Sequence, residues 1–128
     1  MNKLHSRFYN VSRFSFLTDK GEFRQVIKEN KIDIFLIQET KMIPTDKLPS
    51  FPGYTILAKP CKQAADSEKN RGGLLTGIRN TIPYREIKGD NLRDKEDGIT
   101  EWQTVEIPIS AKEKWRITNM YIRKNRRC

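Results

Sequence analysis

The fold is decided by one stretch, Ile32-Asp33-Ile34-Phe35-Leu36-Ile37-Gln38-Glu39-Thr40-Lys41. Its first six residues are β-branched or apolar with one exception, which is typical of a strand covered on both faces. Glu39 stands where this strand would end, and a carboxylate there is costly to bury unless it is paired or binds a cation. The carboxyl ends of strands are also the usual position of sites in α/β sheets. The stretch therefore predicts a buried strand, with Glu39 as a candidate functional residue.

The residues before this strand predict an α/β opening. Phe8–Val11 is a short strand candidate, and Thr18 or Asp19 can cap a helix that follows it. The apolar positions of this helix fall on one face: Phe23, Val26 and Ile27. Asn30-Lys31 is a natural end for the helix. Strand, helix and buried strand thus follow one another.

The second half of the chain is rich in strand patterns. Candidates are Tyr54–Ala58, the glycine-led run Gly72–Ile78, Thr100–Ile109 and Trp115–Ile122, with Ser110–Glu113 as a hairpin loop between the last two. One helix and several successive strands predict an α/β (α+β) fold, a partial two-layer β-sandwich flanked by helices on its outer faces.

Length and composition limit the classes of protein that the chain can belong to. Its 128 residues suit one domain, and a net charge of +9 with a pI near 9.7 favours polyanionic partners. Anionic membrane surfaces would be attracted by the same charge. Cys61 and Cys128 share no metal-ligand spacing and are expected to be free thiols in a reducing compartment. Residues 1–7 lack the apolar core of a secretory signal, and no run has the length of a membrane span. These features predict an intracellular protein, nuclear or cytoplasmic.

The run around Glu39 resembles the metal-ligand strand of the endonuclease/exonuclease/phosphatase superfamily, and most of all the endonuclease domains of non-LTR retrotransposons. Asn10 on the first strand matches the early asparagine of that family. Arg71–Ile78 resembles its glycine-led strand, Glu101 falls near a recurrent glutamate, and Ile117–Ile122 resembles the strand that carries its active-site tyrosine. These four features stand in the family's order around the Glu39 run, and together with it they cover nearly the whole chain. The resemblance implies a DNase I-like fold for the amino-terminal part of such a domain.

The resemblance also implies roles for three residues. Glu39 would hold Mg²⁺ or Mn²⁺, which stabilises charge on the leaving oxygen. Asn10 would support the metal and phosphate site, and Tyr121 would donate its phenolic hydrogen to a phosphate oxygen. Each residue has a simpler interpretation. Glu39 can pair with Lys41, Asn10 can be a turn or cap residue, and Tyr121 can be ordinary strand packing. We interpret Glu101 as structural.

The chain departs from the family after its tyrosine. Residues 123–128 form a basic tail of unknown origin, so the predicted domain is a truncated one over residues 1–122. Relatives continue with an aspartate–x–asparagine strand and an aspartate–histidine pair. Here no aspartate follows Asp97, and His5, the single histidine, lies outside every family motif. We therefore expect little or no activity from the isolated chain, and an inner sheet face that lacks a second sheet to cover it.

Three hypotheses of function remain at this stage. The first is a Mg²⁺-dependent phosphodiesterase, the endonuclease of a mobile element, with DNA as the partner and RNA as an alternative. The second is a non-catalytic, basic nucleic-acid-binding fragment. Interleaving of aromatic and basic residues does not favour it, because Trp102 and Trp115 sit in strand patterns and are expected in the core. The third is a phosphatase-type relative that acts on small phosphoesters. No hypothesis involves a membrane, and the oligomeric state stays open.

Overall fold

The computed structural model describes residues 7–12, 20–42, 47–60, 72–88, 92–93 and 99–123. One helix, α1, spans Lys20–Glu29. The strands in chain order are β1 Phe8–Ser12, β2 Ile34–Gln38, β3 Tyr54–Lys59, β4 Leu74–Arg79, β5 Arg85–Ile87, β6 Leu92–Arg93, β7 Ile99–Pro108 and β8 Lys114–Arg123.

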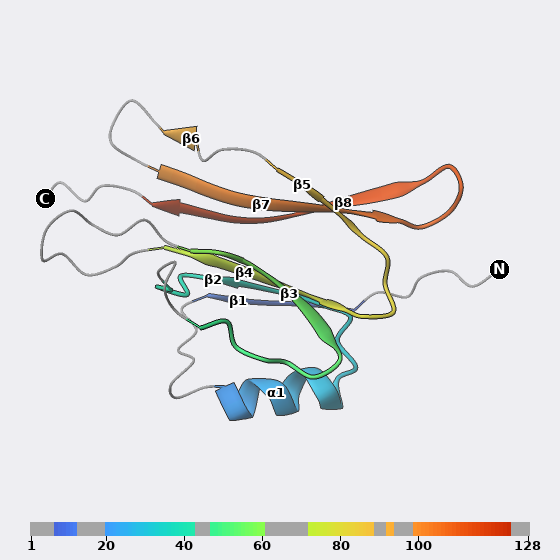
Figure 1. Ribbon diagram of the computed structural model, residues 1–128, viewed down its shortest axis with the longest axis horizontal. Coiled ribbons are helices and arrows are strands. Elements are labelled where there is room, and N and C mark those ends of the chain that lie inside the picture. Colours follow the sequence, from blue (N-terminus) through green and yellow to red (C-terminus); the bar gives the residue numbers. More distant parts are fainter. Residues whose placement is uncertain are drawn as a thin grey trace, which may run out of the picture.

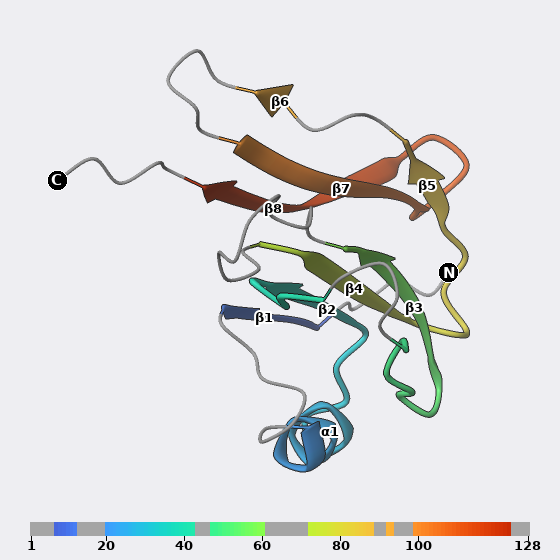
Figure 2. The ribbon, with the colours of Figure 1, turned by 60° about the vertical axis from the view of Figure 1, so that its left-hand side comes forward.

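These strands form two sheets that lie face to face (Figures 1 and 2). The first sheet has the order β1-β2-β4-β3, with β1 parallel to β2 and the other pairs antiparallel. In the second sheet β7 pairs with β5 and β6 and also with β8. α1 covers the outer side of the first sheet (Figure 2). The predicted class, an α/β sandwich with helical cover on its outer side, is confirmed, and among the described residues α1 supplies that cover.

The helix–strand opening also follows the prediction. The α1 helix begins within the described residues at Lys20, and the proposed caps Thr18 and Asp19 lie outside them. It ends at Glu29, where the side-chain amide of Asn30 donates to the carbonyl oxygen of Val26 at 2.9 Å. Lys31 then takes a positive φ of 49°, which stops the helix and turns the chain toward β2.

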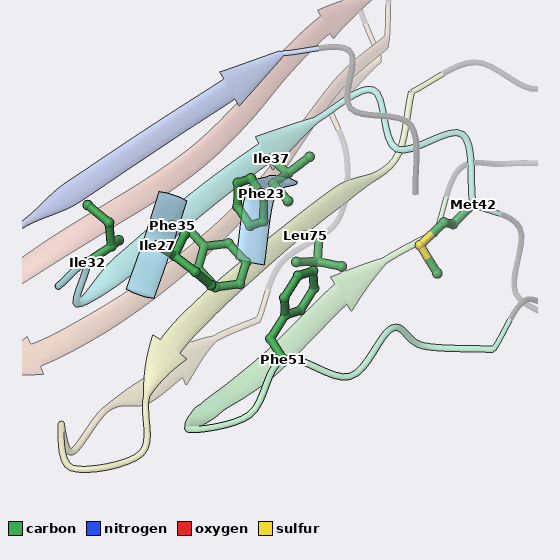
Figure 3. Close-up of a cluster of buried hydrophobic side chains, with 8 residues drawn as sticks. All are labelled: Phe23, Ile27, Ile32, Phe35, Ile37, Met42, Phe51 and Leu75. Atoms are coloured by element: carbon green, nitrogen blue, oxygen red, sulfur yellow. The ribbon is translucent and has the colours of Figure 1, made fainter. Parts of the chain in front are cut away.

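One hydrophobic core lies between α1 and the first sheet (Figure 3). Phe23 and Ile27 of α1 pack on Phe35 and Ile37 of β2, with Leu75 of β4 beside them. The rings of Phe23 and Phe35 meet edge to face with centroids 5.1 Å apart. This cluster uses every second residue of β2, which leaves the alternate residues for the other face of the sheet.

A second core lies between the two sheets. Ile34 of β2 and Ile78 of β4 pack with Val105 and Ile107 of β7, and all four are at most 1% exposed. The expectation of an uncovered inner face is therefore wrong. The hairpin β7–β8 supplies the covering sheet, because its odd-numbered residues are apolar at one end and point toward the first sheet.

Two further sequence predictions concern the hairpin of the last two long strands and the burial of the two tryptophans. The hairpin of the last two long strands is confirmed, with Ile109 N donating to the carbonyl oxygen of Glu113 at 2.9 Å. Trp115 is 39% exposed, so its assignment to the core is wrong. It lies at the rim of the sandwich, with its ring 6.2 Å from that of Phe8. Trp102 is half-buried.

Other predictions concern residues that the structure describes in part or not at all. His5, Cys61, Cys128 and the tail beyond Arg123 lie outside the described residues. Within the described part of the chain, no helix has the length and apolarity needed to cross a membrane.

Candidate active site

Glu39 follows directly after β2, in a backbone conformation that is unusual for its residue type. Its φ is +57°, in the left-handed region that side chains with a Cβ avoid at a cost of about 1–2 kcal/mol. The next residues hold this turn in place, since Thr40 N donates to the carbonyl oxygen of Gly73 at 3.2 Å and Lys41 N to that of Gly72 at 2.8 Å. The turn places Glu39 directly after β2, at one end of the sandwich. Strain of this kind is often found at functional sites.

Tyr121 of β8 meets Glu39 at this end of the sandwich. The Tyr121 hydroxyl donates to Glu39 Oε1 at 2.6 Å, between two residues 82 positions apart in the chain. A short bond from a neutral donor to a carboxylate is stronger than one between two neutral groups. It fixes the carboxylate's orientation and links the two sheets.

Asn10 of β1 reaches the same end through Gln38, the residue before Glu39. Gln38 Nε2 donates to Asn10 Oδ1 at 2.6 Å and to Asn119 Oδ1 of β8 at 2.7 Å. Asn119 is 1% exposed, and its Nδ2 donates to the carbonyl oxygens of Ile37 and Leu75 at 3.1 and 3.0 Å. The amides of three strands are thus joined in one network.

The same network continues across the inner faces of β4 and β7. Thr76 Oγ1 accepts from Asn119 Nδ2 at 3.3 Å and donates to Gln103 Oε1 at 2.6 Å. Thr76 and Gln103 are 1% and 6% exposed. Buried polar groups are costly unless they are hydrogen-bonded, and here the side-chain amides and the Thr76 hydroxyl form hydrogen bonds with one another.

Glu101 brings a second carboxylate to this end. It stands opposite Tyr121 in the β7–β8 register, so both side chains point to the same face. It is 4% exposed, and its two oxygens accept from Gly73 N at 3.3 and 3.1 Å. A Cβ on Gly72 would lie 1.8 Å from Glu101 Oε1. Glycine is therefore required at position 72 both by its φ of +83° and by the carboxylate beside it.

The three predicted site residues lie at one end of the molecule. Glu39 and Tyr121 are bonded directly, and Asn10 is joined to them through Gln38. Sequence reasoning did not single out Gln38 or Asn119. A signal was present in β8, where Ile117, Asn119 and Tyr121 alternate on one face, and an asparagine between two inward-facing residues marks a buried polar position.

The donor set bears on whether these residues suit a metal ion. Within the described part of the chain, no three His, Cys, Asp or Glu side chains are close enough to form a metal cluster. Glu39 is half-buried and accepts from the Tyr121 phenol, and the Glu101 carboxylate at the same end accepts from Gly73 N. Such a donor set suits Mg²⁺, which takes one or two carboxylates and keeps its other positions for water and phosphate. It does not suit a closed site of zinc type.

A different polar cluster lies on the outer face of the second sheet. Glu106 of β7 forms ion pairs with Arg85 at 3.2 Å, Lys114 at 3.5 Å and Arg116 at 3.2 Å. Burial acts to raise the pKa of Glu106, but the hydrogen bond from Arg116 and the charges of Arg85 and Lys114 outweigh it and lower the pKa. Three cations face one carboxylate, so the cluster carries a surplus of positive charge.

Comparison with solved protein structures identifies proteins that are similar in fold to this chain. The crystal structure of the AP endonuclease LMAP from Leishmania major matches with a TM-score of 0.68 and 17% identity, over 91% of this chain and 40% of that one. The catalytic domain of human Nocturnin with bound sulfate matches with a TM-score of 0.45 and 18% identity, over 76% of this chain and 41% of that one. No protein-family model and no curated protein matches.

The likeness to the AP endonuclease shows a DNase I-like α/β sandwich fold, which is the fold that the sequence resemblance implied. The chain spans less than half of the length of that endonuclease.

Proposed function

We propose that this chain supplies part of a metal-dependent phosphodiesterase site, with Glu39, Tyr121 and Asn10 as the residues that act on a phosphate group. The observation that carries the proposal is the 2.6 Å bond between the Tyr121 hydroxyl and Glu39 Oε1 at the end of a buried strand. It joins a carboxylate, a ligand type that Mg²⁺ takes, to a phenol at the end of a sandwich whose fold is shared with an AP endonuclease.

Glu39 is the residue that would hold Mg²⁺ or Mn²⁺. Its carboxylate is oriented by Tyr121, and its backbone is held by the pairing of Thr40 and Lys41 with Gly73 and Gly72. When bound, the cation supplies electrostatic stabilisation of negative charge on the phosphate oxygens. The protein's part is to hold one hard oxygen ligand in a fixed place, which lowers the entropy cost of binding.

Tyr121 and Asn10 would contact the phosphate. The Tyr121 hydroxyl donates to Glu39 in this structure. It can rotate and donate to a phosphate oxygen instead as negative charge develops there. Asn10 is exposed on β1 and carries a neutral amide at the same end. Neither group adds charge of its own to the site, so neither repels a phosphodiester.

The substrate that we propose is nucleic acid, DNA in the first place and RNA as the alternative. A net charge of +9 supports a polyanionic substrate, and so does the fold shared with an AP endonuclease. The resemblance of the run around Glu39 to retrotransposon endonucleases supports an origin in a mobile element. We expect slow turnover from these residues alone, because Glu39 does not both hold a metal and activate water, and the Glu101 carboxylate is engaged by Gly73 N.

Metal binding tests the proposal without requiring turnover. Titration with Mn²⁺, whose paramagnetism broadens nearby NMR signals, should broaden the amide signals of residues 38–41 and 121 first. Glu39→Gln keeps the shape of the side chain and removes its charge, so we expect the selective broadening to disappear. Glu22→Gln, which neutralises an exposed carboxylate on α1, should leave it unchanged. Equal broadening in the wild type and Glu39→Gln would exclude Glu39 as the ligand.

A plasmid-nicking assay tests the activity itself. Weak nicking that requires Mg²⁺ and is abolished in Glu39→Ala is the expected result. Strong nicking that persists in Glu39→Ala, or nicking that survives EDTA, would contradict the assignment of Glu39. Comparison of supercoiled DNA with a single-stranded RNA of similar length would then choose between the two substrates.

The cluster around Glu106 favours a second candidate, a non-catalytic nucleic-acid-binding surface. The side chains of Arg85, Lys114 and Arg116 are 70, 63 and 69% exposed, so all three can reach phosphates while they pair with Glu106. Binding of a duplex that falls steeply with salt, survives EDTA and Glu39→Ala, and weakens in Arg85→Ala plus Arg116→Ala would favour this function. Binding that requires Glu39 and a divalent cation would favour the first.

A further inference from the structure

Three side-chain amides run from the buried layer between the sheets to the exposed edge strand β1. Asn119 is 1% and Gln38 7% exposed, whereas Asn10 is exposed on β1. Gln38 stands between the other two, with its Nε2 2.7 Å from Asn119 Oδ1 and 2.6 Å from Asn10 Oδ1. We call the series Asn119–Gln38–Asn10 the amide relay.

The direction of the amide relay is set at its buried end. One side of the Asn119 amide faces the backbone carbonyl oxygens of Ile37 and Leu75, at 3.1 and 3.0 Å. Carbonyl oxygens only accept hydrogen bonds, so this side has to be the NH₂ group. Thr76 agrees, because its hydroxyl gives its own hydrogen to Gln103 at 2.6 Å and is left to accept from Asn119.

Each following amide then has one orientation that avoids two facing oxygens. Asn119 presents its Oδ1 to Gln38, so the group of Gln38 that faces it has to be the NH₂ group, which donates the hydrogen bond. The same NH₂ group carries a second hydrogen, and that hydrogen goes to Asn10, which has to present Oδ1. The Asn10 NH₂ group lies at the other corner of its planar amide, away from Gln38.

We infer that Asn119 and Gln38 are positioning residues, which hold Asn10 Oδ1 toward Gln38 and leave the Asn10 NH₂ group to donate a hydrogen bond to an anion. An asparagine without such partners can offer either its oxygen or its NH₂ group to a ligand. Here the backbone carbonyl oxygens of Ile37 and Leu75 fix the orientation of the Asn119 amide. Asn119 then fixes the orientation of Gln38, and Gln38 fixes that of Asn10. The identification of the anion as a phosphate oxygen rests on the proposed function; the direction of the amide relay does not.

The direction can be measured in the unmodified protein, without a ligand. NMR detects couplings across a hydrogen bond from the donor nitrogen to the carbon of the accepting carbonyl. We expect couplings from Gln38 Nε2 to the side-chain carbonyl carbons of both Asn10 and Asn119. A coupling in the opposite sense, from Asn10 Nδ2 to the side-chain carbonyl carbon of Gln38, would overturn the inference. So would the absence of any coupling between these residues.

Gln38→Glu should reverse the last step of the amide relay. The new carboxylate has no hydrogen to give, and Asn119 is held by its three acceptors, so Asn10 is the partner that has to turn. The expected signature is a coupling from Asn10 Nδ2 to the carboxyl carbon at position 38. Gln25→Glu adds the same charge on the exposed face of α1 and should leave the Asn10 signals in place. If Asn10 kept its original orientation in Gln38→Glu, the inference would fail.

Titration with inorganic phosphate connects the direction to binding. In the wild type the Asn10 NH₂ signals should shift with phosphate. In Gln38→Glu the dissociation constant should rise by about fivefold more than in Gln25→Glu, the equivalent of one lost hydrogen bond. Gln38→Met lets Asn10 sample both orientations without added charge, so a rise of about twofold is expected.

These measurements separate the two proposals. Couplings in the expected sense together with Asn10 signals that phosphate leaves unmoved would support the amide relay and overturn the phosphate role of Asn10. Phosphate-induced shifts with the couplings reversed would do the opposite. The wild-type couplings also decide the question if Gln38→Glu does not fold.

Discussion

The layer between the two sheets is apolar at one end and polar at the other, although the same strands build both ends. β2 places Ile34 at the apolar end and Gln38 at the polar end, and β7 does the same with Ile107 and Gln103. All four side chains point inward, as the alternation of each strand requires. The comparison shows that inward direction alone does not make a position part of the hydrophobic core.

The two ends differ in what they contribute. At the apolar end, packing removes nonpolar surface from water, which is the main stabilising term in folding. At the polar end, hydrogen bonds mainly cancel the cost of burial and add about 1 kcal/mol each at best. What the polar end gains is defined geometry, because each amide has a fixed partner and direction. Glu39 and Tyr121 lie at the edge of this polar end.

Truncation at the apolar end should have the largest effect on stability. Ile107 is fully buried, so we expect Ile107→Ala to lower the free energy of unfolding by about 4 kcal/mol through lost transfer energy and the cavity left behind. Urea unfolding measures this loss. Pro108→Ala, at the exposed next position of β7, is the control and should change little. A loss below about 1 kcal/mol in Ile107→Ala would mean that this end is not tightly packed.

Replacement of the buried amide at the polar end should rank second. Asn119→Leu keeps a similar volume but leaves the carbonyl oxygens of Ile37 and Leu75 and the NH₂ group of Gln38 with one partner fewer. We expect a loss of about 3 kcal/mol, from groups that each cost about 1–3 kcal/mol when left unsatisfied. Met120→Leu, at the exposed next position of β8, should cost little. Equal costs for the two variants would contradict a tightly bonded polar layer.

The turn that leads into β4 should rank third, and the chain offers a matched control for it. Ala at position 72 meets both a positive φ and the carboxylate of Glu101, whereas Ala at position 53 meets a φ of +88° in open space. We expect Gly53→Ala to cost about 1 kcal/mol and Gly72→Ala about 1–2 kcal/mol more, because the buried Glu101 has to move. Equal losses on urea unfolding would show that Glu101 yields easily.

Much of this fold was readable from local patterns. The run around Ile34 and Phe35 predicted a strand buried on both faces, and alternation in the last two long strands predicted their hairpin. The position of Glu39 at a strand's end was readable for the same reason, since it depends only on where an apolar run stops. Each of these features depends on residues that are near one another in the sequence.

The polar layer was not readable in that way. Gln38 and Asn119 are 81 residues apart in the sequence, and they form a hydrogen bond only because the second sheet packs on the first. The expectation of an uncovered sheet failed because it was based on the family elements that do not follow Tyr121, whereas the hairpin β7–β8 supplies the covering sheet. Trp115 failed because its strand pattern does not show that it lies at the rim of the sandwich. Long-range pairing decided all three.

Loss of the tyrosine hydroxyl should have a smaller effect on stability. Tyr121→Phe keeps the ring and removes the donor to Glu39 Oε1, for an expected loss of about 1 kcal/mol. The sharper readout is the crystal structure or the NMR signals of Glu39, whose carboxylate should lose its fixed orientation. Tyr84→Phe, on a partly buried ring at the apolar end, is the control and should leave Glu39 unchanged. An unmoved Glu39 carboxylate in Tyr121→Phe would show that other contacts position it.

The smallest effect is expected at Glu106, and it should depend on pH. A lowered pKa in the folded protein means that the ionised form contributes stability above the ordinary carboxyl pKa of 4.5, and that this stability is lost as the pH falls through the folded pKa. Glu106→Gln should therefore be less stable than the wild type at neutral pH, and the difference should shrink toward zero in acid. Because Arg85, Lys114 and Arg116 are largely exposed, high salt should shrink it too. Glu113→Gln, in the exposed hairpin loop, gives the background for urea unfolding at each pH. A difference that grew on acidification would mean that burial, and not the three cations, determines the charge state of Glu106.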